Sequence, residues 1–112
     1  MERGRRFRDR VIMRIFSSFR GRVVCISPLE EQEVDGELCR TFAFDVENNA
    51  GLRIRCKTSQ DLARRCARVI KWGTFVSMRN IFARSSRDWH LMGNHYEAVV
   101  DESSRLRYVG NV

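Results

Sequence analysis

Three cationic residues alternate along a short segment with the composition of a β-strand. The segment LRIRCK (residues 52–57) alternates apolar and cationic side chains. Because successive side chains of a strand point to opposite faces, Arg53, Arg55 and Lys57 are predicted to share one outer face. Arginine forks onto phosphate oxygens, and all but two of the 21 basic residues are arginines. The row is therefore a candidate contact for a phosphate backbone, and its alternative is a solvated strand face.

A tryptophan lies in a polar, basic turn farther along the chain. The stretch RSSRDWHLMGNHY (residues 84–96) places Arg84 and Arg87 just before Trp89, and His95 follows. An indole ring can stack on an unpaired base for about 1–3 kcal/mol, while arginines contact the neighbouring phosphates. These four residues join the cationic row as candidate nucleic-acid-binding residues. The alternative for Trp89 is that it covers one end of the fold.

Catalytic and metal-binding patterns are missing from the sequence. It has no nucleophile elbow, zinc-protease motif, phosphate-binding loop or dinucleotide fingerprint, so we expect neither an enzyme nor a cofactor. Asp45 and Glu47 are expected on a solvated strand face. His90 and His95 are predicted to point to opposite faces of a strand, so no metal site is expected. The four cysteines form no CxxC pair and are expected to be reduced, buried thiols of an intracellular protein.

The elements that position the candidate residues follow the order strand, strand, strand, helix, strand, strand. Strands are predicted at 19–27, 40–47, 52–57, 74–84 and 89–101. Alternation in the second strand places Phe42, Phe44 and Val46 inward. This order, with a long acidic loop between the first two strands and a turn at Asp35-Gly36, fits a five-stranded Greek-key barrel. A two-layer α+β sandwich fits the strand count nearly as well.

The helix of this pattern lies between the third and fourth strands. Thr58 or Ser59 is the predicted N-cap, apolar residues then recur at helical spacing, and Gly73 is the predicted end. Trp72 is expected to pack the end of the helix onto the barrel.

Length and charge indicate one domain with two oppositely charged parts. The chain has 112 residues, enough for one modest core, and no apolar run long enough to suggest a membrane partner. Residues 1–22 hold eight arginines and two acids, so they account for +6 of the formal charge of +7. Residues 28–47 carry seven acids and one base, whereas residues 53–79 carry eight bases and one acid. Two faces of opposite sign are therefore predicted.

The arginine-rich start is predicted to be a separate segment. Its apolar residues, Phe7 to Phe19, recur at helical spacing with arginines opposite, so residues 1–18 are expected to form a basic amphipathic segment. Docking to the barrel or to a partner chain, contact with phosphates, and mitochondrial import are the competing roles, and docking is favoured. The barrel is assigned to residues 19–101 and a C-terminal tail to residues 102–112.

The order and spacing of several short motifs resemble a known family. The turn after DVENN, the opening LRIR, the helix, the strand around NIFAR and the motif Asn94-His95-Tyr96-Glu97 are similar to OB-fold DNA-binding domains of the replication protein A large-subunit family, including meiotic and telomere-protection relatives. The resemblance covers about residues 19–100. It implies a mainly β, five-stranded OB-fold barrel with a helix between strands three and four. It also implies stacking aromatics on the third strand and at the last hairpin, where this sequence has Lys57 and Trp89.

The function expected from this resemblance is non-enzymatic binding of single-stranded DNA. The barrel would be one subunit of a hetero-oligomer with other OB-fold subunits, in replication, recombination or telomere protection. A nuclear location is expected, with a mitochondrial one as the alternative. The rival function is an OB-fold protein-interaction module with little nucleic-acid binding of its own, and RNA is the less favoured ligand.

Overall fold

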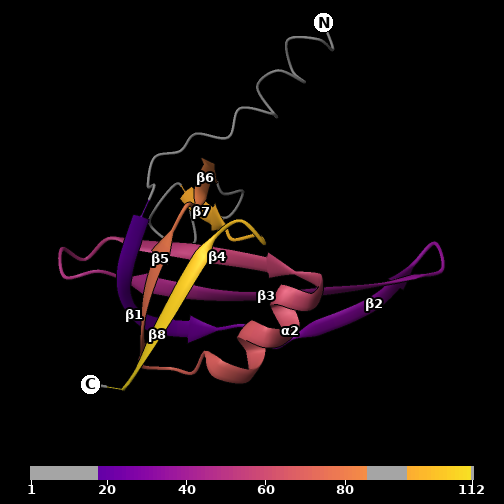
Figure 1. Cartoon of the computed structure of the whole chain (residues 1–112), viewed down its shortest axis with the longest axis horizontal. Helices are drawn as coiled ribbons and strands as arrows, with labels where there is room; N and C mark the ends of the chain where they lie inside the picture. Colours follow the sequence, from indigo (N-terminus) through magenta and orange to yellow (C-terminus); the bar gives the residue numbers. More distant parts are fainter. Residues whose placement is uncertain (1–17, 86–95, 112) are drawn as a thin grey trace, which may run out of the picture.

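The computed structural model describes residues 18–85 and 96–111, which form a curled sheet with one helix (Figure 1). The elements in chain order are β1 (Ser18–Ile26), β2 (Glu30–Val34), β3 (Glu37–Glu47), β4 (Arg53–Ser59), α2 (Gln60–Val69), β5 (Thr74–Arg79), β6 (Phe82–Ser85), β7 (Tyr96–Val99) and β8 (Arg105–Asn111). The mainly β class and the helix after the predicted third strand are confirmed.

The sheet is curled, and one bent stretch of the chain runs between its distant parts. Its order is β6-β7-β4-β3-β1-β5-β8, with β2 paired to β3, and β4 with β7 is the parallel pair. β5 and β6 lie at distant positions in this order, although only Asn80 and Ile81 separate them in the chain. Asn80 has a φ of 58°, a left-handed conformation that asparagine tolerates better than most residues. The predicted fourth strand is therefore real, but this bend divides it into β5 and β6.

The core lies inside the curled sheet and under the helix. The inward prediction for Phe42, Phe44 and Val46 is confirmed, since all three are buried, and the rings of the two phenylalanines are 5.9 Å apart. Ile54 and Cys56 of β4 are buried as predicted. Their outward neighbours are thereby fixed on the opposite face of β4.

Strand β1 passes very close to the end of β3. Gly21 is buried, and a β-carbon there would overlap the carbonyl oxygen of Glu47. The next residue, Arg22, pairs with both neighbouring strands, since it is a register partner of Glu47 in β3 and of Phe75 in β5. The missing side chain of Gly21 lets β1 serve both pairings.

The helix begins where the sequence predicts and ends earlier. Ser59 occupies the N-cap position with extended backbone, whereas the hydroxyl of Thr58 is buried and donates to the Phe42 carbonyl oxygen at 2.9 Å. The helix ends at Val69, and Gly73 instead takes a φ of 90° in the turn before β5. Trp72 in this turn is 70% exposed, so the expectation that it packs against the barrel is wrong.

The acidic segment and the C-terminal residues are more ordered than the sequence pattern indicates. The predicted Asp35-Gly36 turn is present, and it joins β2 to an early start of β3 in a hairpin that extends away from the body (Figure 1). In the segment assigned as a tail, β8 pairs with β5 along the sheet edge. Phe19, counted with the amphipathic segment, is a buried residue of β1, and residues 1–17 lie outside the described part.

Candidate nucleic-acid interface

The predicted cationic row lies on the outer face of β4. Arg53, Arg55 and Lys57 are each partly exposed, while Ile54 and Cys56 between them are buried. β4 is central in the sheet, between β3 and β7, so each cation has a strand on either side. The sequence prediction that these three residues share one face is confirmed by this alternation.

A buried carboxylate on β3 holds two of the three cations. Asp45 is the register partner of Arg55, and its side chain is only 2% exposed. Arg53 donates to Oδ2 of Asp45 from Nε at 3.2 Å and from Nη2 at 3.0 Å, and Arg55 donates from Nε to Oδ1 at 3.0 Å. The expectation of a solvated Asp45 is therefore wrong, because the two guanidinium groups cover it. A buried carboxylate is tolerated when it is paired in this way.

A second buried carboxylate pairs with the third cation. Lys57 Nζ lies 3.2 Å from Oε2 of Glu97, whose side chain is 7% exposed. Glu97 belongs to β7, where it is the register partner of Arg55 in β4 and of Arg84 in β6. We call the three cations with these two acids, Asp45 and Glu97, the β4 surface. Its charges alternate across the strands and leave a small net positive charge.

The sequence contained a signal for the Asp45 pair. The turn at 48–51 predicts a hairpin between the segments 40–47 and 52–57, and pairing outward from that turn brings Asp45 opposite Arg55. Glu97 carried no such signal, since its pairing with β4 is parallel and crosses a helix and two strands. Both acids were missing from the predicted site.

The remaining predicted residues belong to the hairpin beside the β4 surface. Arg84 lies in β6, which pairs with β7, and β7 pairs with β4. Arg87, Trp89 and His95 lie outside the described residues, and their roles stay predictions. The hairpin starts from Ser85 in β6 and returns at Tyr96 in β7. β7 is the direct neighbour of β4, and β6 is the next strand beyond it.

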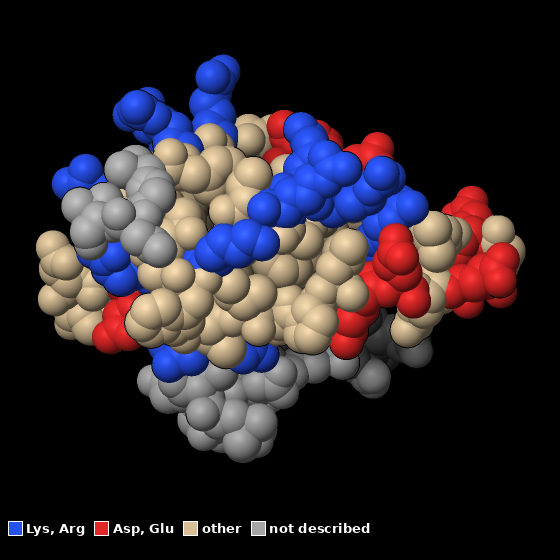
Figure 2. All heavy atoms as spheres, turned by 90° about the horizontal axis from the view of Figure 1, so that it is seen from below, with Lys and Arg blue, Asp and Glu red and all other residues tan. Residues whose placement is uncertain are grey.

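Charge is segregated over the surface as the sequence predicts. Figure 2 shows acidic side chains gathered at the β2–β3 hairpin and basic ones across the middle of the view. In the hairpin, the residues of β2 are all exposed, and Arg40 is held by Glu31 at 2.6 Å. The two regions of opposite sign are thus adjacent in space.

Burial affects the ionisation of two of the cysteines. All four cysteines are free, and burial raises the pKa of Cys56 and Cys66, which favours their thiol form. Within residues 18–85 and 96–111, no group of three or more histidine, cysteine, aspartate or glutamate residues is placed to hold a metal ion. In the same ranges, no helix is long and apolar enough to cross a membrane.

Comparison with known proteins identifies the fold. No protein-family model and no curated protein matches the sequence. Among solved structures, the chain is similar to a replication protein A heterotrimer bound to single-stranded DNA, with a TM-score of 0.74 and 13% identity over 82% of this chain and 21% of that one. It therefore spans about a fifth of the length of that relative.

Two smaller solved domains show the same similarity. DNA-binding domain A of Saccharomyces cerevisiae replication protein A has a TM-score of 0.64 and 12% identity, over 85% of this chain and 83% of that one. The OB domain of Ta0387 from Thermoplasma acidophilum has a TM-score of 0.58 and 20% identity, over 82% and 73%. The chain therefore has an OB fold of the kind found in the DNA-binding domains of replication protein A.

Proposed function

We propose that the chain is a non-enzymatic single-stranded DNA-binding module that uses the β4 surface and the β6–β7 hairpin. The observation that carries this proposal is the row Arg53, Arg55 and Lys57 on the outer face of β4, in the same sheet as the hairpin that bears Trp89. OB folds bind oligonucleotides on this part of the barrel. The two replication protein A structures are described as bound to single-stranded DNA and as a DNA-binding domain, which agrees with the proposal.

The ion pairs of the β4 surface determine which donor groups and how much positive charge it would offer to DNA. Asp45 fixes Nε and Nη2 of Arg53, so Nη1 stays outside these contacts on a side chain that is partly exposed. A guanidinium held in this way is oriented before DNA arrives and loses less side-chain entropy on binding. The paired acids also lower the net positive charge, so phosphate attraction at this surface is modest. Base stacking on Trp89 would then supply most of the affinity.

Modest affinity for DNA fits a subunit of a larger assembly. We infer that the chain works with other OB-fold subunits in a hetero-oligomer, where linked sites raise the overall affinity. Replication, recombination or telomere protection in the nucleus is the proposed setting, with mitochondria as the alternative location.

One test measures the binding of labelled oligo-dT at low and high salt by the wild type, Trp89→Ala and Trp89→Phe. We expect salt-sensitive binding that weakens by about 1–3 kcal/mol in Trp89→Ala. Trp89→Phe retains an aromatic ring and is expected to keep most of the affinity. Undetectable binding by the wild type at micromolar protein and low salt would contradict the proposal.

A second candidate function is a protein-interaction module. The β2–β3 hairpin favours it, because the hairpin is acidic and exposes Val34 by 46% and Leu38 by 48%. Exposed apolar side chains within a charged surface are typical of protein contacts. In this case oligo-dT would not bind, and substitution of Val34 and Leu38 by serine would release a basic partner chain.

A further inference from the structure

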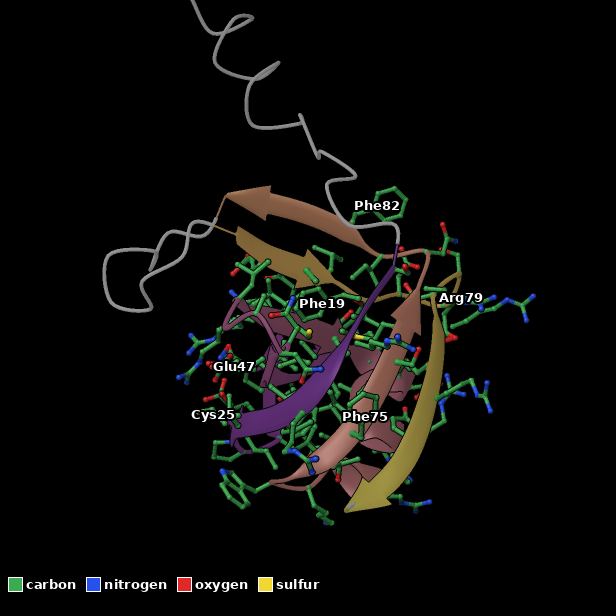
Figure 3. The ribbon with its side chains drawn as sticks, turned by 90° about the vertical axis from the view of Figure 1, so that its left-hand side faces the viewer. Phe19, Cys25, Glu47, Phe75, Arg79 and Phe82 are labelled. Atoms are coloured by element: carbon green, nitrogen blue, oxygen red, sulfur yellow. The ribbon has the colours of Figure 1, made fainter. Side chains whose placement is uncertain are left out.

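A second group of arginines occupies the outer face of β1, β5 and β8. Figure 3 looks onto these three strands, which lie side by side. Ser18 is the register partner of Arg79, which is in turn the partner of Arg105. The next row pairs Arg20 with Ser77, and Ser77 with Arg107. We call the exposed arginines of this face the arginine surface: Arg20, Arg22, Arg79, Arg105 and Arg107.

Among the described residues, the arginine surface has no carboxylate partner. Within residues 18–85 and 96–111, its five members make none of the ion pairs, and only Arg22 makes a hydrogen bond through its guanidinium, to the Gly73 carbonyl oxygen at 3.0 Å. Strands are about 4.8 Å apart and alternate residues about 7 Å apart, so the five side chains, in three rows on three strands, start within a patch of roughly 14 by 10 Å. A concentrated, unneutralised positive charge of this kind attracts a polyanion.

Repulsion between two of these arginines lowers the stability of the sheet. Arg79 and Arg105 are directly opposite each other, and like charges in that position destabilise a pair of strands. A bound anion between them would remove this repulsion. The pair of strands would therefore gain from an anionic ligand that lies between the two guanidinium groups.

Aromatic side chains and a hollow accompany these charges. An open hollow of about 720 Å³ is lined by Arg20, Arg79 and Phe75 together with the turn at 48–50. Phe75 is half-buried on β5, and the exposed Trp72 lies in the turn whose Gly73 carbonyl accepts from Arg22. Basic groups combined with accessible aromatics are the composition of a single-strand binding surface, where bases stack and phosphates pair.

We propose that the arginine surface is a second contact site for single-stranded DNA, with the phosphate backbone on its arginines and an unpaired base at Phe75 or Trp72. The choice of DNA as the ligand rests on the proposed function. The turn at 48–51 connects the two surfaces, because it joins β3 to the Arg53 end of β4 and also lines the hollow. A strand longer than the β4 surface accommodates would continue around this turn onto β1 and β5.

The test compares two double variants that remove the same charge. Arg105→Ala with Arg107→Ala removes the β8 part of the arginine surface, whereas Arg64→Ala with Arg68→Ala removes two exposed arginines of α2. Binding is measured with oligo-dT of about 8 and about 30 nucleotides over a range of salt, since one OB fold covers about 4–16 nucleotides. Circular dichroism and urea midpoints establish that both variants are folded.

We expect the β8 variant to bind the long oligonucleotide more weakly and the short one as the wild type does. Its slope of log affinity against log salt should fall by about 1.4, because each phosphate contact on a single strand contributes about 0.7. Trp72→Ala should weaken binding of the long oligonucleotide by about fivefold or more. The helix variant should match the wild type at both lengths, apart from a small long-range charge effect.

Three results would overturn the inference. If the wild type binds both oligonucleotides and the β8 variant behaves as the helix variant does, the arginine surface is not a DNA contact, while the proposed function stands. If sedimentation velocity shows that the β8 variant loses self-association and keeps its DNA affinity, the arginine surface instead contacts a second copy of the chain. If the wild type binds neither length, the proposed function fails together with this inference.

Discussion

The β4 surface and the arginine surface are two positively charged regions of one sheet. The cations of the first are paired with buried acids, whereas those of the second are not, within the described part of the chain. On β4, three cations share two buried acids, Asp45 and Glu97. On β1, β5 and β8, five arginines have no acidic partner among the described residues, and two of them oppose each other. The number of basic residues in a strand therefore does not tell how much charge is available to a ligand. Availability depends on what the neighbouring strand places in the same row.

The difference has an energetic consequence. The cations of the β4 surface contribute to the stability of the fold, because removing them would leave the carboxylates of Asp45 and Glu97 buried without these partners. The arginines of the other surface satisfy no buried carboxylate, and among the described residues only Arg22 donates a hydrogen bond, to the Gly73 carbonyl oxygen, so the fold depends less on them. We therefore expect mutations on the two surfaces to separate stability from binding.

The largest effect is expected for the partners of Asp45. Combining Arg53→Ala with Arg55→Ala should lower the free energy of unfolding by about 3 kcal/mol, because Asp45 would remain buried without its two guanidinium partners. Combining Arg105→Ala with Arg107→Ala should change it by less than about 0.5 kcal/mol. Urea denaturation measures both values, and equal losses in the two variants would remove the distinction between the surfaces.

An intermediate effect is expected when the acid itself loses its charge. Asp45→Asn should destabilise the fold by about 1–3 kcal/mol, since a buried charged hydrogen-bond acceptor is replaced by an amide that faces cations. The same change should increase affinity for oligo-dT and steepen its salt dependence by about 0.7 for each additional phosphate contact.

Asp61→Asn is the matched control, because Asp61 is exposed and has the same charge. Weaker binding by Asp45→Asn, with the protein still folded, would show that the fixed orientation of Arg53 and Arg55 matters more for binding than their free charge.

The smallest effect is expected within the arginine surface. Arg105→Glu would place an acid opposite Arg79 and should stabilise the sheet by about 0.2–1 kcal/mol. Arg107→Glu makes the same charge change opposite Ser77 and should stabilise it less. Thermal unfolding compares the two variants, and a larger gain for Arg107→Glu would argue against repulsion between Arg79 and Arg105.

Local patterns in the sequence predicted the inward and outward faces well. Alternation placed Phe42, Phe44 and Ile54 inside, and a turn signal located the Asp35-Gly36 hairpin, because both depend on residues close together in the chain. The order of strands and the helix left both a Greek-key barrel and a two-layer α+β sandwich open, and the resemblance of the motifs to replication protein A domains favoured the barrel.

Features that depend on distant residues were missed. The Lys57–Glu97 pair needs the parallel register of β4 with β7, and β8 becomes a strand because β5 offers it an open edge. The segment 102–112 has mainly polar and charged residues, so its own pattern resembles a tail. Similarly, nothing local distinguishes Trp72, which is exposed, from a packing residue.

The parallel pairing of β4 with β7 also affects when the two charged surfaces can form during synthesis. Among the described strands, β7 and β8 come after β6 in the chain, and each completes one of the two charged surfaces, β7 through Glu97 and β8 through Arg105 and Arg107. Non-local pairings of this kind form late, since a long intervening loop must be closed first. A nascent chain that has emerged only as far as β6 would therefore carry most of the core residues and neither finished surface.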